Sequence, residues 1–328
     1  MQADNPIIIC YGNEFFLRDE YVTALIDRWI DPILKDFSVI RFDLAETTLD
    51  AVIDEAETAP FMVEKKIVIA RGALFLTGAK DSSKVEHRPE RLLTYMKAPA
   101  DFSIVILLVD AEKLDERKKI VKALKELKCL KSFQSLSADD LPEWAQGRAR
   151  KLGFTFEQDA LERFILYTGG QLQAMSSELA KLLLYAGSEK SVTVGMVEAM
   201  VVRGTEQNVF ILMEDIVQKR MERAFDILYD LLKQREEPIK LIMLMARQFR
   251  LILQVKDLLG QGYSQQQIAT QVGSHPYPIK LAAEQGRKYE IERLKTILTD
   301  IADLDYHIKS GRVEKVLGLE MLLLKLAQ

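Results

Sequence analysis

The hydrophobic periodicity of the chain changes once, close to Ser137, and this change limits the folds that the sequence can adopt. Before Ser137, short apolar runs of the kind found in buried strands alternate with helical patterns. After Ser137, apolar residues recur at the helical spacing of about 3.6 residues almost to the end. Alternating strands and helices predict a parallel sheet with helices on both faces. We therefore expect an α/β region followed by an all-α region.

Five strands are expected in the α/β region, and Ile104–Val109 is the strongest because all six of its residues are aliphatic. The expected strands cover residues 7–11, 39–42, 66–70, 104–109 and 129–133. Asn13 and Thr48 precede helical patterns in this region, and Ser137 precedes the first helix of the all-α region. These three side chains are expected to cap their helices, because short polar side chains accept hydrogen bonds from the first free N–H groups.

The all-α region is long enough to be divided further. A chain of 328 residues suits about two domains, or three. Gly169-Gly170 and Gly187-Ser188 break its first helices, and Thr205 begins a block of longer ones. We predict three domains, at residues 1–137, 138–205 and 206–328, and no convincing strand after about residue 156.

Composition excludes several classes of protein. A formal net charge of −4 argues against a protein that binds nucleic acid through bulk positive charge. Cys10 and Cys129 are isolated and the three histidines lie far apart, which argues against a disulfide framework and a Cys/His zinc site. No apolar run reaches about 18 residues, so no transmembrane helix is expected. The N-terminus lacks the pattern of a secretory signal, and the cytoplasm is the expected location.

An N-terminal parallel sheet followed by helices is also typical of ATPases, whose P-loop reads G-x-x-x-x-G-K-[ST]. Here Gly12 is followed by Asn13-Glu14-Phe15-Phe16, which offers no lysine and places a carboxylate where phosphate would lie. Gly72–Lys80 resembles the motif with wrong spacing, and Asp110 and Glu112 are an interrupted version of the acidic pair that holds magnesium. No G-x-S-x-G, H-E-x-x-H or G-x-G-x-x-G motif occurs. We expect no intrinsic catalysis, no metal and no cofactor.

A series of short motifs extends over nearly the whole chain. The motifs are Cys10-Tyr11-Gly12-Asn13-Glu14, Phe42-Asp43-Leu44, Ala56-Glu57-Thr58-Ala59-Pro60-Phe61-Met62, Lys65-Lys66-Ile67-Val68-Ile69, Leu114-Asp115-Glu116-Arg117-Lys118-Lys119, Tyr229-Asp230-Leu231-Leu232, Glu237-Pro238-Ile239-Lys240 and the run Arg247–Gln254. In this order the chain resembles the delta subunits of the bacterial DNA polymerase III clamp loader, of the Firmicute type. The resemblance implies an AAA+-like domain that is degenerate for ATP and contacts the sliding clamp, a helical lid domain, and a C-terminal helical collar domain.

The resemblance also implies a function and partners. A delta subunit binds and opens the beta sliding clamp for loading onto primed DNA, and it makes no covalent bond. Its partners are the clamp, the gamma/tau and delta-prime subunits, and primer–template DNA within the complex. Three alternatives remain: an ATP-binding AAA+ loader subunit, the delta-prime subunit, and a free-standing DNA-binding protein. A delta-prime subunit is expected to carry cysteine-rich zinc ligands and a Ser-Arg-Cys motif, which this sequence lacks.

The first candidate site is the turn Pro60-Phe61-Met62, which follows an amphipathic helix over Leu49–Thr58. Pro60 ends the helix, and the two apolar side chains either pack under their own sheet or enter a pocket on a partner. The resemblance matches this turn to the tip of the clamp-contacting helix. Some relatives carry Leu-Phe at this tip, so Met62 is expected to share the role of Phe61. The polar stretch Leu74–Arg88 is either a surface insertion or a further clamp contact.

Two further kinds of surface are expected. One helix of the last domain is expected to contribute to the collar interface, although most of its apolar residues should be core; the candidates are Arg247, Phe249 and Arg250. Two basic clusters are either solvated charge or contacts to DNA phosphates; they are Arg117, Lys118 and Lys119, and Lys309, Arg312 and Lys315.

Overall fold

The computed structural model of the chain describes residues 5–61, 63–79, 85–187 and 189–327. These residues form two compact units, and the division falls between Ser135 and Leu136. The further division predicted near residue 205 stays a prediction. Among the helices of the described ranges, none combines the length and the apolar character that crossing a membrane requires.

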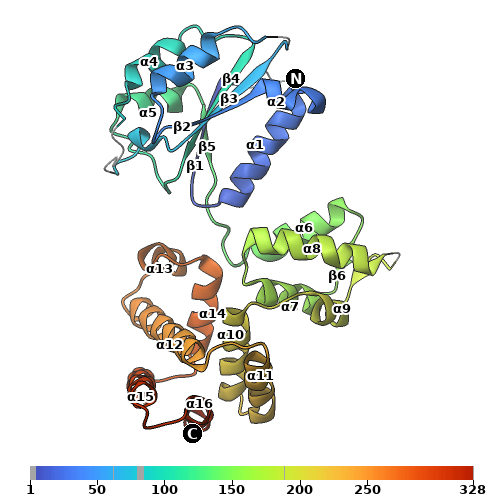
Figure 1. The fold of residues 1–328 in the computed structure, drawn as a ribbon, viewed down its shortest axis with the longest axis vertical. Coiled ribbons are helices and arrows are strands. Elements are labelled where there is room, and N and C mark those ends of the chain that lie inside the picture. The colour runs from blue at the N-terminus through green and yellow to red at the C-terminus, as the bar shows by residue number, and fades with distance from the viewer. Residues whose placement is uncertain (1–4, 62, 80–84, 188, 328) are drawn as a thin grey trace. The chain divides into compact units, whose positions relative to one another are not determined.

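The first unit is built from alternating strands and helices, as the sequence predicts (Figure 1). Its elements are β1 (Ile7–Tyr11), α1 (Phe15–Trp29), η1 (Pro32–Leu34), α2 (Lys35–Ser38), β2 (Val39–Asp43), α3 (Leu49–Glu57), β3 (Lys66–Arg71), η2 (Leu74–Leu76), α4 (Pro89–Tyr95), β4 (Ser103–Val109), α5 (Lys119–Glu126) and β5 (Leu130–Ser132).

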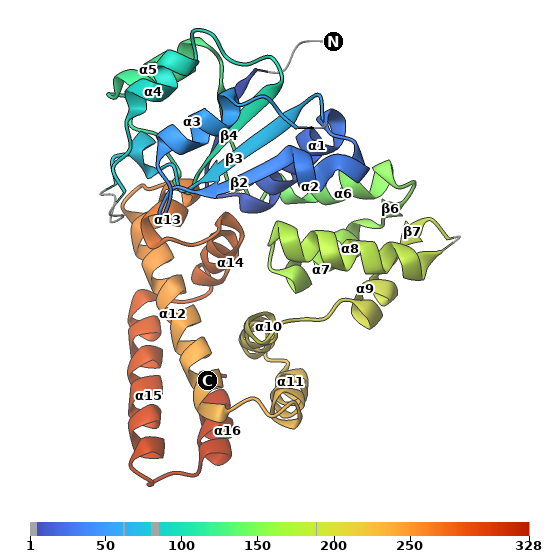
Figure 2. The ribbon, with the colours of Figure 1, turned by 45° about the horizontal axis from the view of Figure 1, so that its top comes forward.

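The five strands form one parallel sheet in the order β2-β3-β4-β1-β5. Alternate residues of a strand point to opposite faces, so both faces of this apolar sheet need a cover. On one face, Ile7 and Ile9 pack with residues of α3, α4 and α5. On the other, Ile8 and Cys10 pack with residues of α1. The expected sheet with helices on both faces is confirmed (Figure 2).

The predicted helix caps of this unit had different outcomes. Thr48 caps α3, because its hydroxyl accepts a hydrogen bond from the N–H of Ala51. The prediction for Asn13 is wrong: its side-chain oxygen accepts a hydrogen bond from the N–H of Ser135, and Glu14 occupies the cap position of α1. A partner distant in sequence therefore takes the oxygen that a cap would use.

The second unit is almost entirely helical, and the view in Figure 2 shows the long helices α12 and α15 side by side. Its elements are α6 (Leu141–Lys151), β6 (Thr155–Phe156), α7 (Gln158–Thr168), α8 (Leu172–Ala186), β7 (Ser191–Val192), α9 (Val194–Met200), α10 (Thr205–Val217), α11 (Met221–Lys233), α12 (Pro238–Gly260), α13 (Gln265–Val272), α14 (Pro276–Gly286), α15 (Ile291–Lys309) and α16 (Lys315–Leu326).

Two predictions for this unit are wrong. The absence of strands after residue 156 fails, because β6 and β7 pair in parallel through Thr155, Phe156 and their partners Ser191 and Val192. Ser137 does not cap α6, since Asp140 holds the cap position. The Ser137 hydroxyl instead forms a turn before the helix, accepting from the N–H of Asp140 and donating to its carboxylate.

The core of the second unit is centred on α12, which contacts α10, α13, α14, α15 and α16. One face of this helix is buried at Leu241, Ile242, Met245, Phe249 and Ile252, which follow the helical repeat. The opposite face carries Met243, Arg247 and Arg250, which are exposed.

Candidate partner-binding site

The turn between α3 and β3 presents one large aromatic side chain to solvent. Phe61 is 84% exposed, whereas Pro60 is half-buried, and Met62 lies outside the described residues. The helix stops at Thr58, which is extended, and Ala59 precedes a proline, a position that disfavours helical backbone. The Thr58 hydroxyl donates to the carbonyl of Asp54 and so satisfies one free carbonyl of the last turn. Phe61 therefore lies beyond its own core.

The two ends of this turn are joined by a buried lysine. Lys66, the first residue of β3, is 2% exposed. Its ammonium group donates to the backbone carbonyl of Glu55, and to the Glu55 carboxylate at 2.7 Å. A buried charge is tolerated when it is paired and hydrogen-bonded. We call this contact the Lys66–Glu55 clasp; it closes the chain between the last turn of α3 and the start of β3.

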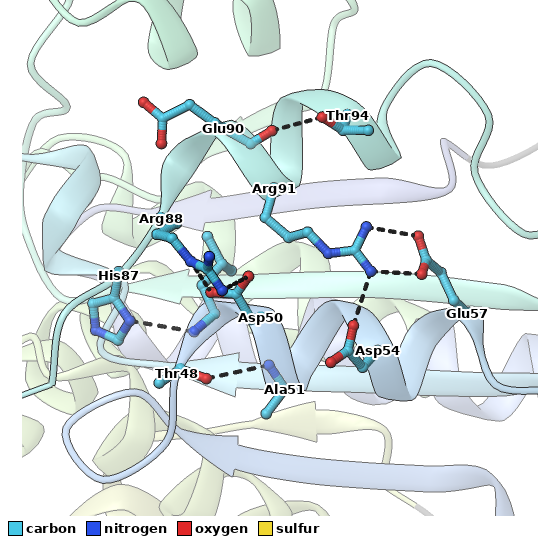
Figure 3. Close-up of polar contacts among 11 residues, drawn as sticks. Thr48, Asp50, Ala51, Asp54, Glu57, His87, Arg88, Glu90, Arg91 and Thr94 are labelled. Carbon is cyan, nitrogen blue, oxygen red and sulfur yellow. Dashed lines mark hydrogen bonds and ion pairs between the residues drawn. The ribbon is translucent and has the colours of Figure 1, made fainter.

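A second set of ion pairs holds α3 to α4 (Figure 3). Arg91 reaches from α4 to the last turn of α3, where it pairs with Asp54 at 2.8 Å and Glu57 at 2.7 Å. One turn earlier in α3, Asp50 pairs at 2.9 Å with Arg88, which holds the cap position of α4. Arginine donates in a planar fork, which fixes the relative position of both carboxylates. The helix that leads into the exposed Phe61 is thus held on its outer side as well as by the clasp.

These contacts define what the turn can do chemically. The described residues Pro60 and Phe61 offer no nucleophile and no acid–base pair, and Phe61 is an apolar side chain that projects from a fixed base. Full burial of such a side chain is worth about 1.5–3 kcal/mol. An aromatic group that enters a desolvated pocket is a typical energetic centre of a protein interface. The turn is suited to bind a protein with an apolar pocket.

The turn after β1, where a P-loop would lie, is filled by the chain itself. Its backbone N–H groups are used internally, since Gly12 donates to the carbonyl of Ala111 and Glu14 to that of Phe133. Gly12 has a φ of +124°, and a Cβ there would lie 1.9 Å from the carbonyl oxygen of Phe133. Burial raises the pKa of the Glu14 carboxyl. Phosphate recognition needs free N–H groups, and this turn offers none at Gly12 and Glu14.

The carboxyl end of β4 is occupied in the same manner. The Asp110 carboxylate pairs with Arg18 of α1, whose guanidinium also stacks over the ring of Phe15 at 4.7 Å. The acidic residue that the sequence suggested as a relic of a magnesium site therefore has a structural partner.

The first basic cluster is held mainly by its own neighbours. Arg117 forks onto Asp115 at 2.9 Å and holds the pKa of that carboxyl at about 2. Lys118 donates to the carbonyl of Phe75 at 2.7 Å. Lys119, at the start of α5, is exposed and has no ion-pair partner among the described residues. Within this cluster, Lys119 is the side chain most available to a phosphate.

The second basic cluster surrounds the turn between α15 and α16. Lys309 pairs with Asp305 at 2.6 Å, and Lys315 approaches Glu237 at 3.5 Å. The guanidinium of Arg312 lies over the ring of Tyr306 at 5.6 Å. The three cations remain exposed, so these surface contacts compete weakly with a stronger anionic partner.

The three collar candidates separate into two environments. Phe249 is 1% exposed and meets the ring of Tyr289 edge-on inside the helical core. Arg247 and Arg250 face solvent and line a groove of about 260 Å³, where Arg247 pairs with Glu206 at 2.8 Å. The two arginines are exposed and can contact a neighbouring protein directly. Phe249 is buried and can only stabilise the helix that carries them.

Sequence reasoning missed two features of the first unit. It did not find the Lys66–Glu55 clasp, because nothing in a sequence marks a lysine at the start of a strand as buried. It also passed over Ile33, Leu34 and Phe37, which are exposed. Three large apolar residues between a helix and a strand were a signal that could have found this surface.

Comparisons with known proteins all identify the same family. Residues 9–134 match the family model described as DNA polymerase III, delta subunit, and residues 206–326 match the model of the C-terminal domain of that subunit. The DNA polymerase III subunit delta of Bacillus subtilis (strain 168) is 39% identical over 322 residues, 98% of this chain and 93% of the relative. A probable DNA polymerase III subunit delta of Aquifex aeolicus (strain VF5) is 21% identical over 305 residues, 91% of this chain and 85% of the relative.

A solved structure agrees with these relatives. The Bacillus subtilis DNA clamp loader delta protein superimposes with a TM-score of 0.82 and 39% identity, over 98% of this chain and 95% of that one.

Proposed function

The chain belongs to the family of DNA polymerase III delta subunits, and on this basis we propose that it binds and opens the beta sliding clamp without catalysis of its own. The observation that carries the proposal is Phe61, 84% exposed on a turn with a fixed base. In this proposal Phe61 enters an apolar pocket of the clamp, and Pro60 and Met62 flank it. The chain works in the cytoplasm.

Opening a ring requires differential binding. A ligand shifts an equilibrium between closed and open forms only by as much as its affinities for the two forms differ. A turn that moved freely would adapt equally to both forms. The clasp and the Arg91 ion pairs fix the helix before Phe61 and the start of the strand after it, so that the turn can favour the form of the clamp that matches it.

The other surfaces have supporting roles in the proposal. Arg247 and Arg250 contact a neighbouring subunit of the gamma/tau or delta-prime type in the collar. Lys119 and the cations Lys309, Arg312 and Lys315 approach the phosphates of primer–template DNA once the complex has assembled. ATP is bound by other subunits, because the N–H groups of Gly12 and Glu14 already have partners within the chain.

The proposal is tested with Phe61→Ala. We expect the Kd for the clamp to rise about 10-fold to 150-fold, which corresponds to about 1.5–3 kcal/mol of lost burial. Surface plasmon resonance with immobilised clamp measures this change, and size-exclusion chromatography checks that assembly with the other loader subunits is retained. Leu184→Ala is the matched control, since Leu184 is 85% exposed in the second unit. Wild-type clamp affinity of the Phe61 variant would refute the proposed site.

A further inference from the structure

The first unit has a second exposed apolar surface, which we call the Ile33 patch and which consists of Ile33, Leu34 and Phe37. Ile33 is 86% exposed and Phe37 is 73% exposed, and Leu34 lies between them in η1. Ile33 lies in η1, and Phe37 lies in α2, the short helix that follows it directly. Scattered exposed apolar residues are normal, but a contiguous group marks an interaction surface.

The chain on either side of the patch is anchored, which fixes the direction in which the patch faces. Ile30 before it and Ser38 after it are buried. The Asp31 carboxylate accepts the N–H of Ile33 at 2.9 Å and starts the turn. Lys35 pairs with Asp27 of α1. The patch is thus held outward by the local fold, as Phe61 is by its clasp.

Sheet register places the patch at the same edge of the sheet as the Phe61 turn. The patch leads directly into β2 and the Phe61 turn leads into β3, and these strands are paired in parallel with Val39 opposite Ile67. Neighbouring strands lie about 4.8 Å apart. Helix α2 also contacts β3 directly. Both apolar surfaces therefore precede the amino ends of adjacent strands.

One contact joins the two segments. The ammonium group of Lys65 lies over the ring of Trp29, 4.5 Å from its centroid. Lys65 is four residues after Phe61, and Trp29 is four residues before Ile33. A cation over an indole face is attracted by the ring quadrupole. This contact ties the end of α1, just before the patch, to the residue that precedes β3.

We infer that the Ile33 patch is a second contact to the same partner that receives Phe61, the beta sliding clamp. The inference rests on the proposed function. A stable interface covers about 800 Å² on each partner, roughly 30 Å across, which is far more than one side chain. A partner seated on Phe61 must extend over neighbouring surface, and the exposed apolar group at the amino end of the adjacent strand supplies it. The partner surface opposite the patch is expected to be apolar.

The test uses the full chain and clamp from the same organism, with Ile33→Ser, Phe37→Ser, Phe61→Ala and the control Leu184→Ser. All four side chains are exposed, so circular dichroism and thermal unfolding should match the wild type. We expect each patch variant to raise the Kd for the clamp about tenfold, as measured by surface plasmon resonance. Leu184→Ser should leave the Kd unchanged.

Two outcomes separate this inference from the proposed function. A raised Kd for Phe61→Ala together with unchanged values for Ile33→Ser and Phe37→Ser overturns the inference and leaves the proposed function intact. Unchanged values for all three variants overturn both. Size-exclusion chromatography of the chain alone adds one more readout: patch variants that abolish self-association without changing clamp affinity assign the patch to a second copy of this chain, and the inference fails.

Discussion

Phe61 and Phe249 are the same residue type in two regions of the molecule, and both were predicted to contact partners. In the turn before β3, Phe61 is 84% exposed. In α12, Phe249 is 1% exposed and belongs to the core of its own unit. Phe61 follows the end of a helix and does not belong to its buried face. By contrast, α12 packs against five other helices, which bury the side chains on its inward face. The position of an aromatic residue relative to the periodic pattern therefore separates these two cases: Phe61 lies outside the pattern and is exposed, whereas Phe249 lies within it and is core.

The largest effect that can test this contrast is expected for Phe249→Ala. The variant leaves a cavity in the helical core, and we expect the free energy of unfolding to fall by about 3–5 kcal/mol. Urea denaturation followed by circular dichroism measures the loss. Met243→Ala on the exposed face of α12 is the control and should change stability by less than about 0.5 kcal/mol. Equal losses of unfolding free energy in the two variants would contradict the assignment of Phe249 to the core and of Met243 to the exposed face.

The next effect concerns the base of the Phe61 turn. Lys66→Met keeps the length of the side chain but leaves the carbonyl of Glu55 without its lysine donor. We expect a loss of about 1–3 kcal/mol in unfolding free energy, and a weaker clamp affinity although Phe61 is unchanged. Lys125→Met, which breaks the exposed pair with Glu116, is the control and should cost less than about 1 kcal/mol. A stability of Lys66→Met equal to that of the control would show that the clasp is dispensable.

Much of the fold could be predicted because it depends on local pattern. The run Ile104–Val109 falls inside β4 (Ser103–Val109), and Thr48 caps α3 as expected. Both signals act within a few residues of the element that they define. The degenerate turn after β1 was recognised in the same way, because the missing lysine and the carboxylate of Glu14 are visible in the sequence alone.

Apart from the local turn that Ser137 makes with Asp140, most of what the sequence did not show depends on groups distant in sequence. Asn13 is drawn to the N–H of Ser135, 122 residues away, and not to the helix beside it. Strands β6 and β7 have two residues each, and a segment of two residues is too short to show the alternating pattern of a strand. The Arg91 ion pairs link residues 34 and 37 positions apart. In the candidate site, therefore, the exposed side chain could be predicted, while the contacts that hold it could not.

The smallest expected effect is a pH dependence that belongs to the helical unit. His275 holds the cap position of α14, which packs on α12, and its Nδ1 accepts the N–H of Tyr277. Burial lowers the pKa of this imidazole below its ordinary value of 6.5. As pH falls below 6.5, the unfolded chain takes up a proton that the folded chain resists, so stability declines until the pH is below the lowered pKa.

A pair of histidine variants separates the contribution of His275 to this decline from that of the other histidines. We expect the urea midpoint of the wild type to fall between pH 7 and about 5.5. His275→Asn keeps a capping side chain and should flatten the profile, whereas His307→Asn, the control, should retain the wild-type slope. An unchanged slope in His275→Asn would mean that the protonation of His275 does not cause the loss of stability at low pH.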